Sequence, residues 1–111
     1  MEKQMTSPPE RDWKYMRKVK EDLIADLCEQ INGQAMDILK SEAKSERERY
    51  GLLYRHVQES DDIVANCFDD WRRSTLLMKL VALKRHGLLT SDHIQHLSEE
   101  TQKRLKALEE L

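Results

Sequence analysis

The sequence predicts an all-α fold, a helical bundle of about four helices with one long N-terminal helix. Ala, Glu, Lys, Leu and Arg make up 52 of the 111 residues, which is close to the composition of long helices and coiled coils. Three Gly and two Pro are too few for the many turns of a β-sandwich or barrel. Apolar residues also recur at helical spacing along most of the chain. We therefore expect residues 1–111 to form a single all-helical domain.

The first predicted helix covers about residues 8–41. Ser7 and Glu10 have the spacing of a capping box, and Pro8 suits the first helical position. Residues 1–6 precede this signal, so we expect them to be disordered. A single apolar stripe then faces a partner helix. Its members are Met16, Leu23, Leu27, Ile31, Ala35 and Ile38.

A helix break is predicted after this stripe, because later apolar residues point about 100° away from it. The rotated stripe consists of Ala43, Tyr50, Leu53, Tyr54 and Val57. Asn32-Gly33 is one candidate for the break and residues 41–45 are the other. We favour residues 41–45, because Ser45 and Glu48 form a second capping box and the first stripe continues past Gly33. The second helix then covers about residues 46–59.

A third helix is predicted from Ser60 to His86. Ser60-Asp61-Asp62 provides a cap and acids for the first turn, and Gly87 provides a stop. From residue 76 onward this helix is apolar on two opposite sides, which indicates burial on both. Thr90 or Ser91 begins the last part of the chain, which forms one helix, or two if Ser98-Glu99-Glu100 starts another.

The third predicted helix carries the candidate interface. Asp69 is placed to pair with Arg72 and Arg73 at helical spacing, on the same side as a leucine stripe. A short last helix cannot cover both this stripe and the open end of the first helix. We therefore expect a homodimer, or contact with another helical protein; the alternative is a monomer whose last helix covers the stripe. The candidate interface residues are Asp69, Arg72, Arg73, Leu76, Leu77, Leu80 and Leu83.

A basic patch with interleaved aromatic residues lies at residues 11–20. Arg11, Lys14, Arg17, Lys18 and Lys20 flank Trp13 and Tyr15, a pattern that suits single-stranded nucleic acid or an anionic surface. Residues 1–58 nevertheless carry eleven basic and eleven acidic residues, so the charge is local. We expect a solvated helical face and keep nucleic-acid or anionic-surface binding as the alternative function.

The histidines and cysteines give weak signals for chemistry. His86, His93 and His96 cluster without a third ligand at a known spacing, so we expect neither a metal nor a cofactor. Cys28 and Cys67 both lie on apolar stripes and are expected to be reduced and buried.

These observations together favour a role in protein contact. The chain has no apolar segment long enough for a secretory signal or a membrane span, and we expect a cytoplasmic protein. With no catalytic motif in the sequence, we expect it to act by protein–protein contact rather than as an enzyme.

Overall fold

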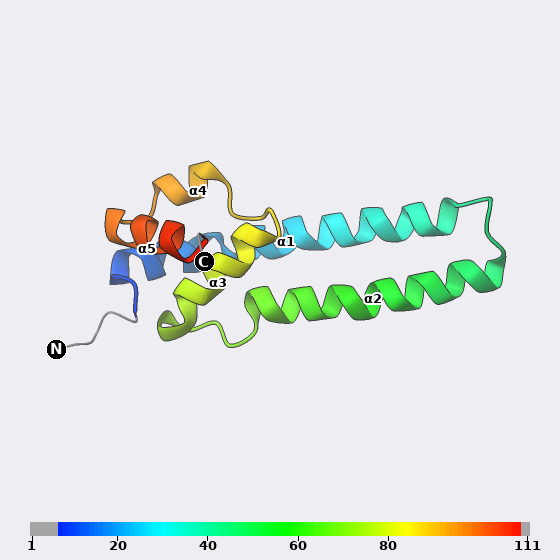
Figure 1. Cartoon of the computed structure of the whole chain (residues 1–111), viewed down its shortest axis with the longest axis horizontal. Coiled ribbons are helices and arrows are strands. Elements are labelled where there is room, and N and C mark those ends of the chain that lie inside the picture. The colour runs from blue at the N-terminus through cyan, green and yellow to red at the C-terminus, as the bar shows by residue number, and fades with distance from the viewer. Residues whose placement is uncertain (1–6, 110–111) are drawn as a thin grey trace.

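The computed structural model describes residues 7–109 and is all-α in this range, as predicted. The expected disorder of residues 1–6 lies outside the described residues. The molecule measures 60 × 24 × 24 Å. Figure 1 shows two long antiparallel helices projecting as a hairpin from a cluster of shorter helices. We call residues 28–59 the arm, and the remaining described residues the head.

Helix α1 spans Glu10–Lys40 and runs from the head to near the tip of the arm, about 46 Å of the 60 Å length of the molecule. The predicted capping box at Ser7 is wrong: Pro9 occupies the N-cap position, and no side chain caps the helix. The proline side chain has no acceptor to offer the first turn, and the Pro9 carbonyl accepts from Asp12 N at 3.0 Å instead. The helix passes through Asn32-Gly33 without interruption.

The break lies at residues 41–45, where it was predicted. Ser45 Oγ accepts a hydrogen bond from Glu48 N at 3.1 Å, and Ser45 N donates to the Glu48 carboxylate at 2.8 Å. The two bonds complete a capping box that begins the next helix. The hydrogen bond from the Ser45 backbone also holds the pKa of Glu48 below its usual value.

Helix α2 spans Glu46–Phe68, so the predicted helix start at Ser60 is wrong. Ser60 is buried within α2, and Asp61 and Asp62 are ordinary exposed positions in mid-helix. The local capping preference of Ser-Asp-Asp is overridden, because Ile63 and Cys67 continue the face that α2 packs against the core.

The chain leaves the helix at Asp69, in the middle of the predicted third helix. Asp70 has a positive φ of 56°, and Arg72 Nε donates to its carboxylate at 2.6 Å. The guanidinium lowers the pKa of Asp70. The predicted helical pairing of Asp69 with Arg72 and Arg73 is therefore wrong, because the backbone between them is not helical.

The short helices follow in order around the head. A 3-10 turn, η2 (Arg73–Thr75), leads into α3 (Leu76–Arg85). Gly87, with φ +74°, ends α3 as predicted, and Leu88 N donates to Leu83 O at 2.9 Å in a Schellman arrangement. Thr90 caps α4 (Ser91–Gln95), and α5 (Glu99–Glu109) follows, so the last segment is two helices.

The hydrophobic core lies entirely in the head. Its buried apolar side chains come from the first half of α1, the end of α2, and the segment from α3 to α5. A buried polar contact joins the two ends of the chain within this core. The Asp12 carboxylate accepts hydrogen bonds from Ser98 N and Ser98 Oγ, both at 2.8 Å, and from Thr101 Oγ1 at 2.6 Å.

Candidate interaction surface

The arm is a two-helix hairpin with nothing packed on either of its faces. The structure describes every residue from 28 to 59, and none of them is buried. The seam between the helices contains half-buried residues such as Ile31, Ile38, Leu53 and His56. Two helices alone enclose little volume, so these side chains remain partly in water.

Part of the seam is polar, which lowers the apolar contribution to its stability. His56 Nε2 donates to the backbone oxygen of Ile31 at 2.9 Å. Arg49 donates to Ser41 O and pairs with Glu46 at 2.9 Å, which closes the tip of the arm. These bonds fix the alignment of the two helices. The bond from His56 to Ile31 sets residue 56 of α2 level with residue 31 of α1.

Exposed apolar side chains concentrate on this arm. Six large apolar residues are exposed among the described residues, and five of them belong to the arm. Their exposed fractions range from 47% for Val57 to 71% for Tyr50. The five are Met36, Leu39, Tyr50, Tyr54 and Val57.

Helical geometry places most of these side chains on one side of the hairpin. A residue that directly follows a seam residue is rotated by about 100° from the seam. Leu39 follows Ile38 in α1, and Val57 follows His56 in α2. Because the helices are antiparallel, the two rotations carry both sets of side chains to the same side.

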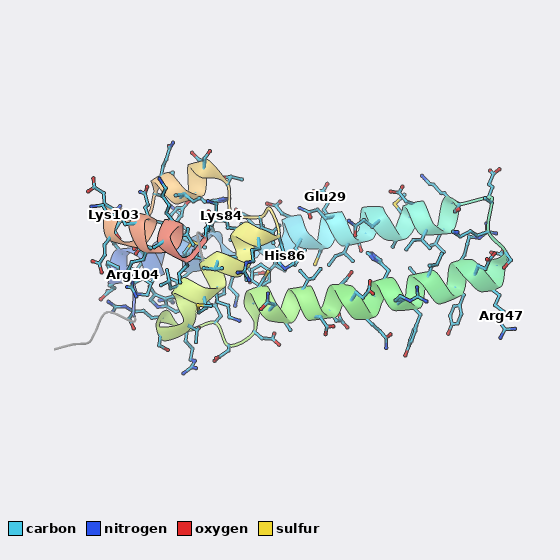
Figure 2. All side chains as sticks on the ribbon, in the orientation of Figure 1. Glu29, Arg47, Lys84, His86, Lys103 and Arg104 are labelled. Atoms are coloured by element: carbon cyan, nitrogen blue, oxygen red, sulfur yellow. The ribbon has the colours of Figure 1, made fainter. Side chains whose placement is uncertain are left out.

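We call this side the arm face and define it by two rows. The α1 row has the spacing four, three, four and contains Cys28, Asn32, Ala35 and Leu39. The α2 row lies at the edge of this side that is away from α1, ends two residues beyond the arm, and contains Arg47, Tyr50, Tyr54, Val57 and Asp61. Figure 2 shows Arg47 at the tip, pointing away from α1.

The opposite side of the arm is mostly polar, with the half-buried Leu52 as an apolar member. Residues that directly precede seam positions point there, and they include Gln30, Asp37, Glu48 and Arg55. All four are exposed. The hairpin is therefore amphipathic across its two faces, a pattern expected of a surface that another helix covers.

No protein-family model, curated protein or solved structure matches this chain. The geometry of the arm therefore carries the functional argument.

The leucines of the interface predicted from the sequence do not form an exposed surface. Leu76, Leu80 and Leu83 have 0% exposure, because α3 packs against α2 and α5 of the same chain. Leu77 is half-buried. The argument that this stripe needs a partner chain to cover it therefore no longer holds.

The three charged members of the predicted interface are held within the head. Arg73 Nε donates to Pro8 O at 2.9 Å, which ties the start of α3 to the start of α1. Arg72 pairs with Asp70 rather than with Asp69. Asp69 is exposed and serves as the C-cap residue of α2.

The aromatic residues of the basic patch are occupied within the chain. Trp13 packs against Trp71 with ring centroids 6.4 Å apart, and Tyr15 stacks on His96 at 4.9 Å. Lys20 lies over the Trp71 ring. Stacking of nucleic-acid bases needs free aromatic faces, so these contacts argue against the alternative function.

The histidines at the end of the chain have structural contacts. His93 Nδ1 accepts from Thr90 N at 3.0 Å and completes the cap of α4. His96 Nδ1 donates to Asp92 O at 2.8 Å. Within residues 7–109, no three His, Cys, Asp or Glu side chains are grouped closely enough to hold a metal ion.

The two cysteines differ in exposure. Cys67 is buried as predicted, and burial raises the pKa of its thiol. Cys28 is exposed, so the prediction that it is buried is wrong. It directly follows Leu27, the last buried residue of α1, and its side chain therefore turns outward onto the arm face.

The sequence signal for the arm face was the rotated stripe of Tyr50, Leu53, Tyr54 and Val57. The rotation correctly indicated a break in the helix. It also meant that these residues do not share the direction of the first stripe, and therefore cannot all face α1. Two tyrosines in such a stripe are typical of a contact surface, where the ring is covered and the hydroxyl stays wet.

Proposed function

We propose that the chain acts by protein–protein contact and that the arm face is its contact surface. The observation that carries this proposal is the separation of core and arm. The head buries its apolar residues, whereas the arm keeps five large apolar side chains exposed and buries none of its residues. Monomeric proteins rarely expose large apolar patches, and those that they do expose are often functional.

The shape of the arm supports contact with helices rather than with a small molecule. Its face is long and follows two helix rows, while small-molecule sites are compact and enclosed. A helix or helical hairpin laid along the rows would fill the groove between them. No helix of residues 7–109 is long and apolar enough to span a membrane. A cytoplasmic location remains a prediction.

Site-specific photo-cross-linking in the native host tests this function. A photoreactive phenylalanine analogue replaces Tyr54 on the arm face or, as a control, the neighbouring Arg55 on the opposite face. Both positions are exposed and adjacent in α2, so the two variants differ only in the face to which the photoreactive side chain points. We expect a discrete protein adduct from position 54 and none from position 55.

A second variant separates surface loss from unfolding. Leu39→Glu in the position 54 background is expected to abolish the adduct, whereas Met78→Glu is expected to leave it. Met78 is also a largely exposed apolar residue, but it lies on α3 in the head. Equal adducts from positions 54 and 55, or an adduct indifferent to Leu39→Glu, would overturn the proposal.

A further inference from the structure

We propose that the partner of the arm face is the arm face of a second copy of this chain, with the two arms antiparallel. The two hairpins then complete a four-helix bundle around a two-fold axis that crosses the middle of the arm. This inference rests on the proposed function, because it names the occupant of the same surface.

The α2 row places similar side chains on either side of Tyr54 and ends at equal distances from it. Tyr50 lies four residues before Tyr54 and Val57 three residues after it, and both are exposed and apolar. Arg47 and Asp61 lie seven residues away on either side, with opposite charges. An antiparallel copy with Tyr54 on the axis therefore brings apolar residues together and sets Arg47 opposite Asp61 of the second copy.

The α1 row is symmetric about the same level of the arm. The hydrogen bond between His56 and Ile31 fixes the alignment, so residue 54 of α2 lies level with residue 33 of α1. About that level, Leu39 meets Cys28 of the second copy, and Asn32 meets Ala35. Both rows thus give the same two-fold axis independently, as an isologous contact requires.

The charge distribution along the arm selects the antiparallel arrangement. Residues 40–55, at the tip, carry five Lys or Arg and three acidic residues. Residues 21–39 carry five acids, as do residues 56–70, and neither segment contains Lys or Arg. Parallel arms would stack these acidic segments on each other, whereas antiparallel arms place each basic tip over the acidic base of the other copy.

The size of the arm face predicts a weak dimer. The α1 part of the arm is about 20 Å long, and two adjacent helices are about 20 Å wide, which gives a face of about 400 Å² per copy. Stable dimers bury about 800 Å² per partner. We therefore expect association at concentrations of about 10–100 µM rather than nanomolar affinity.

Disulfide trapping tests the antiparallel register. The variant Leu39→Cys places a thiol opposite Cys28 of the second copy. Within one chain, positions 28 and 39 lie about 16 Å apart along α1, too far for a disulfide. Mild oxidation is therefore expected to give a covalent dimer. Adding Cys28→Ser is expected to prevent it, and Met78→Cys, at an exposed position in the head, is expected not to form it.

Sedimentation equilibrium tests association without any introduced thiol. The wild type is expected to dimerise, Leu39→Glu to weaken association at least tenfold, and Met78→Glu to leave it unchanged. Arg47→Glu and Asp61→Lys are each expected to weaken it about two- to fivefold, and their combination to restore it. Helicity measured by circular dichroism and tryptophan fluorescence of the head verify that each variant is folded.

Each outcome decides the proposal. A monomeric wild type at about 200 µM would overturn the self-association, and a dimer without the trapped disulfide would overturn the antiparallel register. Either failure leaves the proposed function to its own experiment, since an adduct from position 54 that contains a different protein would still support contact through the arm face.

Discussion

Removing the buried Asp12 side chain should destabilise the head. Its carboxylate is fully buried and accepts three hydrogen bonds from the start of α5. The change Asp12→Ala leaves the backbone N–H of Ser98 without this acceptor. The hydroxyls are partly compensated, because Ser98 Oγ lies 3.1 Å from Thr101 Oγ1 and can donate to it.

The magnitude follows from that accounting. One charge-assisted bond to a buried backbone donor contributes about 1.5–3 kcal/mol, and the rearranged hydroxyls lose about 1 kcal/mol more. We therefore expect Asp12→Ala to lower the free energy of unfolding by about 2–4 kcal/mol. Urea titration followed by tryptophan fluorescence measures this loss, because Trp13 and Trp71 both lie in the head.

Asp26→Ala is the matched control for this change. Asp26 is an exposed aspartate on the same helix, and its removal is expected to change the unfolding free energy by less than about 0.5 kcal/mol. If the free energies of unfolding of Asp12→Ala and Asp26→Ala differed by less than about 0.5 kcal/mol, the contact between the two ends of the chain would not contribute to stability as the hydrogen bonds indicate.

Three further predictions concern cysteine exposure, the core and a helix end. A thiol reagent should label Cys28 quickly in the native protein and Cys67 only after denaturant is added, because Cys67 is buried and its raised pKa keeps it protonated; rapid native labelling of both thiols would contradict this burial. Leu80→Ala should lower the free energy of unfolding by about 2–5 kcal/mol in a denaturant titration, since Leu80 is fully buried; a loss below about 0.5 kcal/mol would show that α3 is not part of the core. Gly87→Ala should lower the free energy of unfolding by about 1 kcal/mol in the same urea titration, because φ at this position is +74°, a conformation that strains any residue with a Cβ even though the added methyl would meet no neighbour; no change would mean that another backbone conformation replaces the observed helix end.

Local signals in the sequence predicted the helical class, the turn at residues 41–45 and the stop at Gly87. Each depends on chemistry within a few residues: the capping box of Ser45 and Glu48, and the freedom of glycine to adopt positive φ. The same kind of signal failed at Ser60-Asp61-Asp62, which looks like a helix start. There, packing of Ile63 and Cys67 against the head outweighs a capping preference of about 1 kcal/mol.

The candidate interface depended on tertiary contacts that periodicity alone does not contain. The leucines at 76, 80 and 83 were correctly recognised as an apolar stripe, but α3 lies deep in the head and its own chain covers both of its sides. The break at residues 69–75 allows this placement. It includes a positive φ at Asp70, which the helical periodicity of the sequence does not reveal. The arm face was visible as a rotated stripe, yet its exposure follows from the position of every short helix at the other end of the molecule (Figure 1).

Hydrogen exchange of the arm at two protein concentrations tests most directly whether another copy covers the arm face. At low micromolar concentration, amides of residues 28–59 should exchange much faster than those of the head, because the arm buries no side chain of its own. At about 500 µM, association should slow exchange in the arm while the head remains unchanged. If residues 28–59 were as protected as the head at both concentrations, the result would contradict the claim that a second copy covers the arm face.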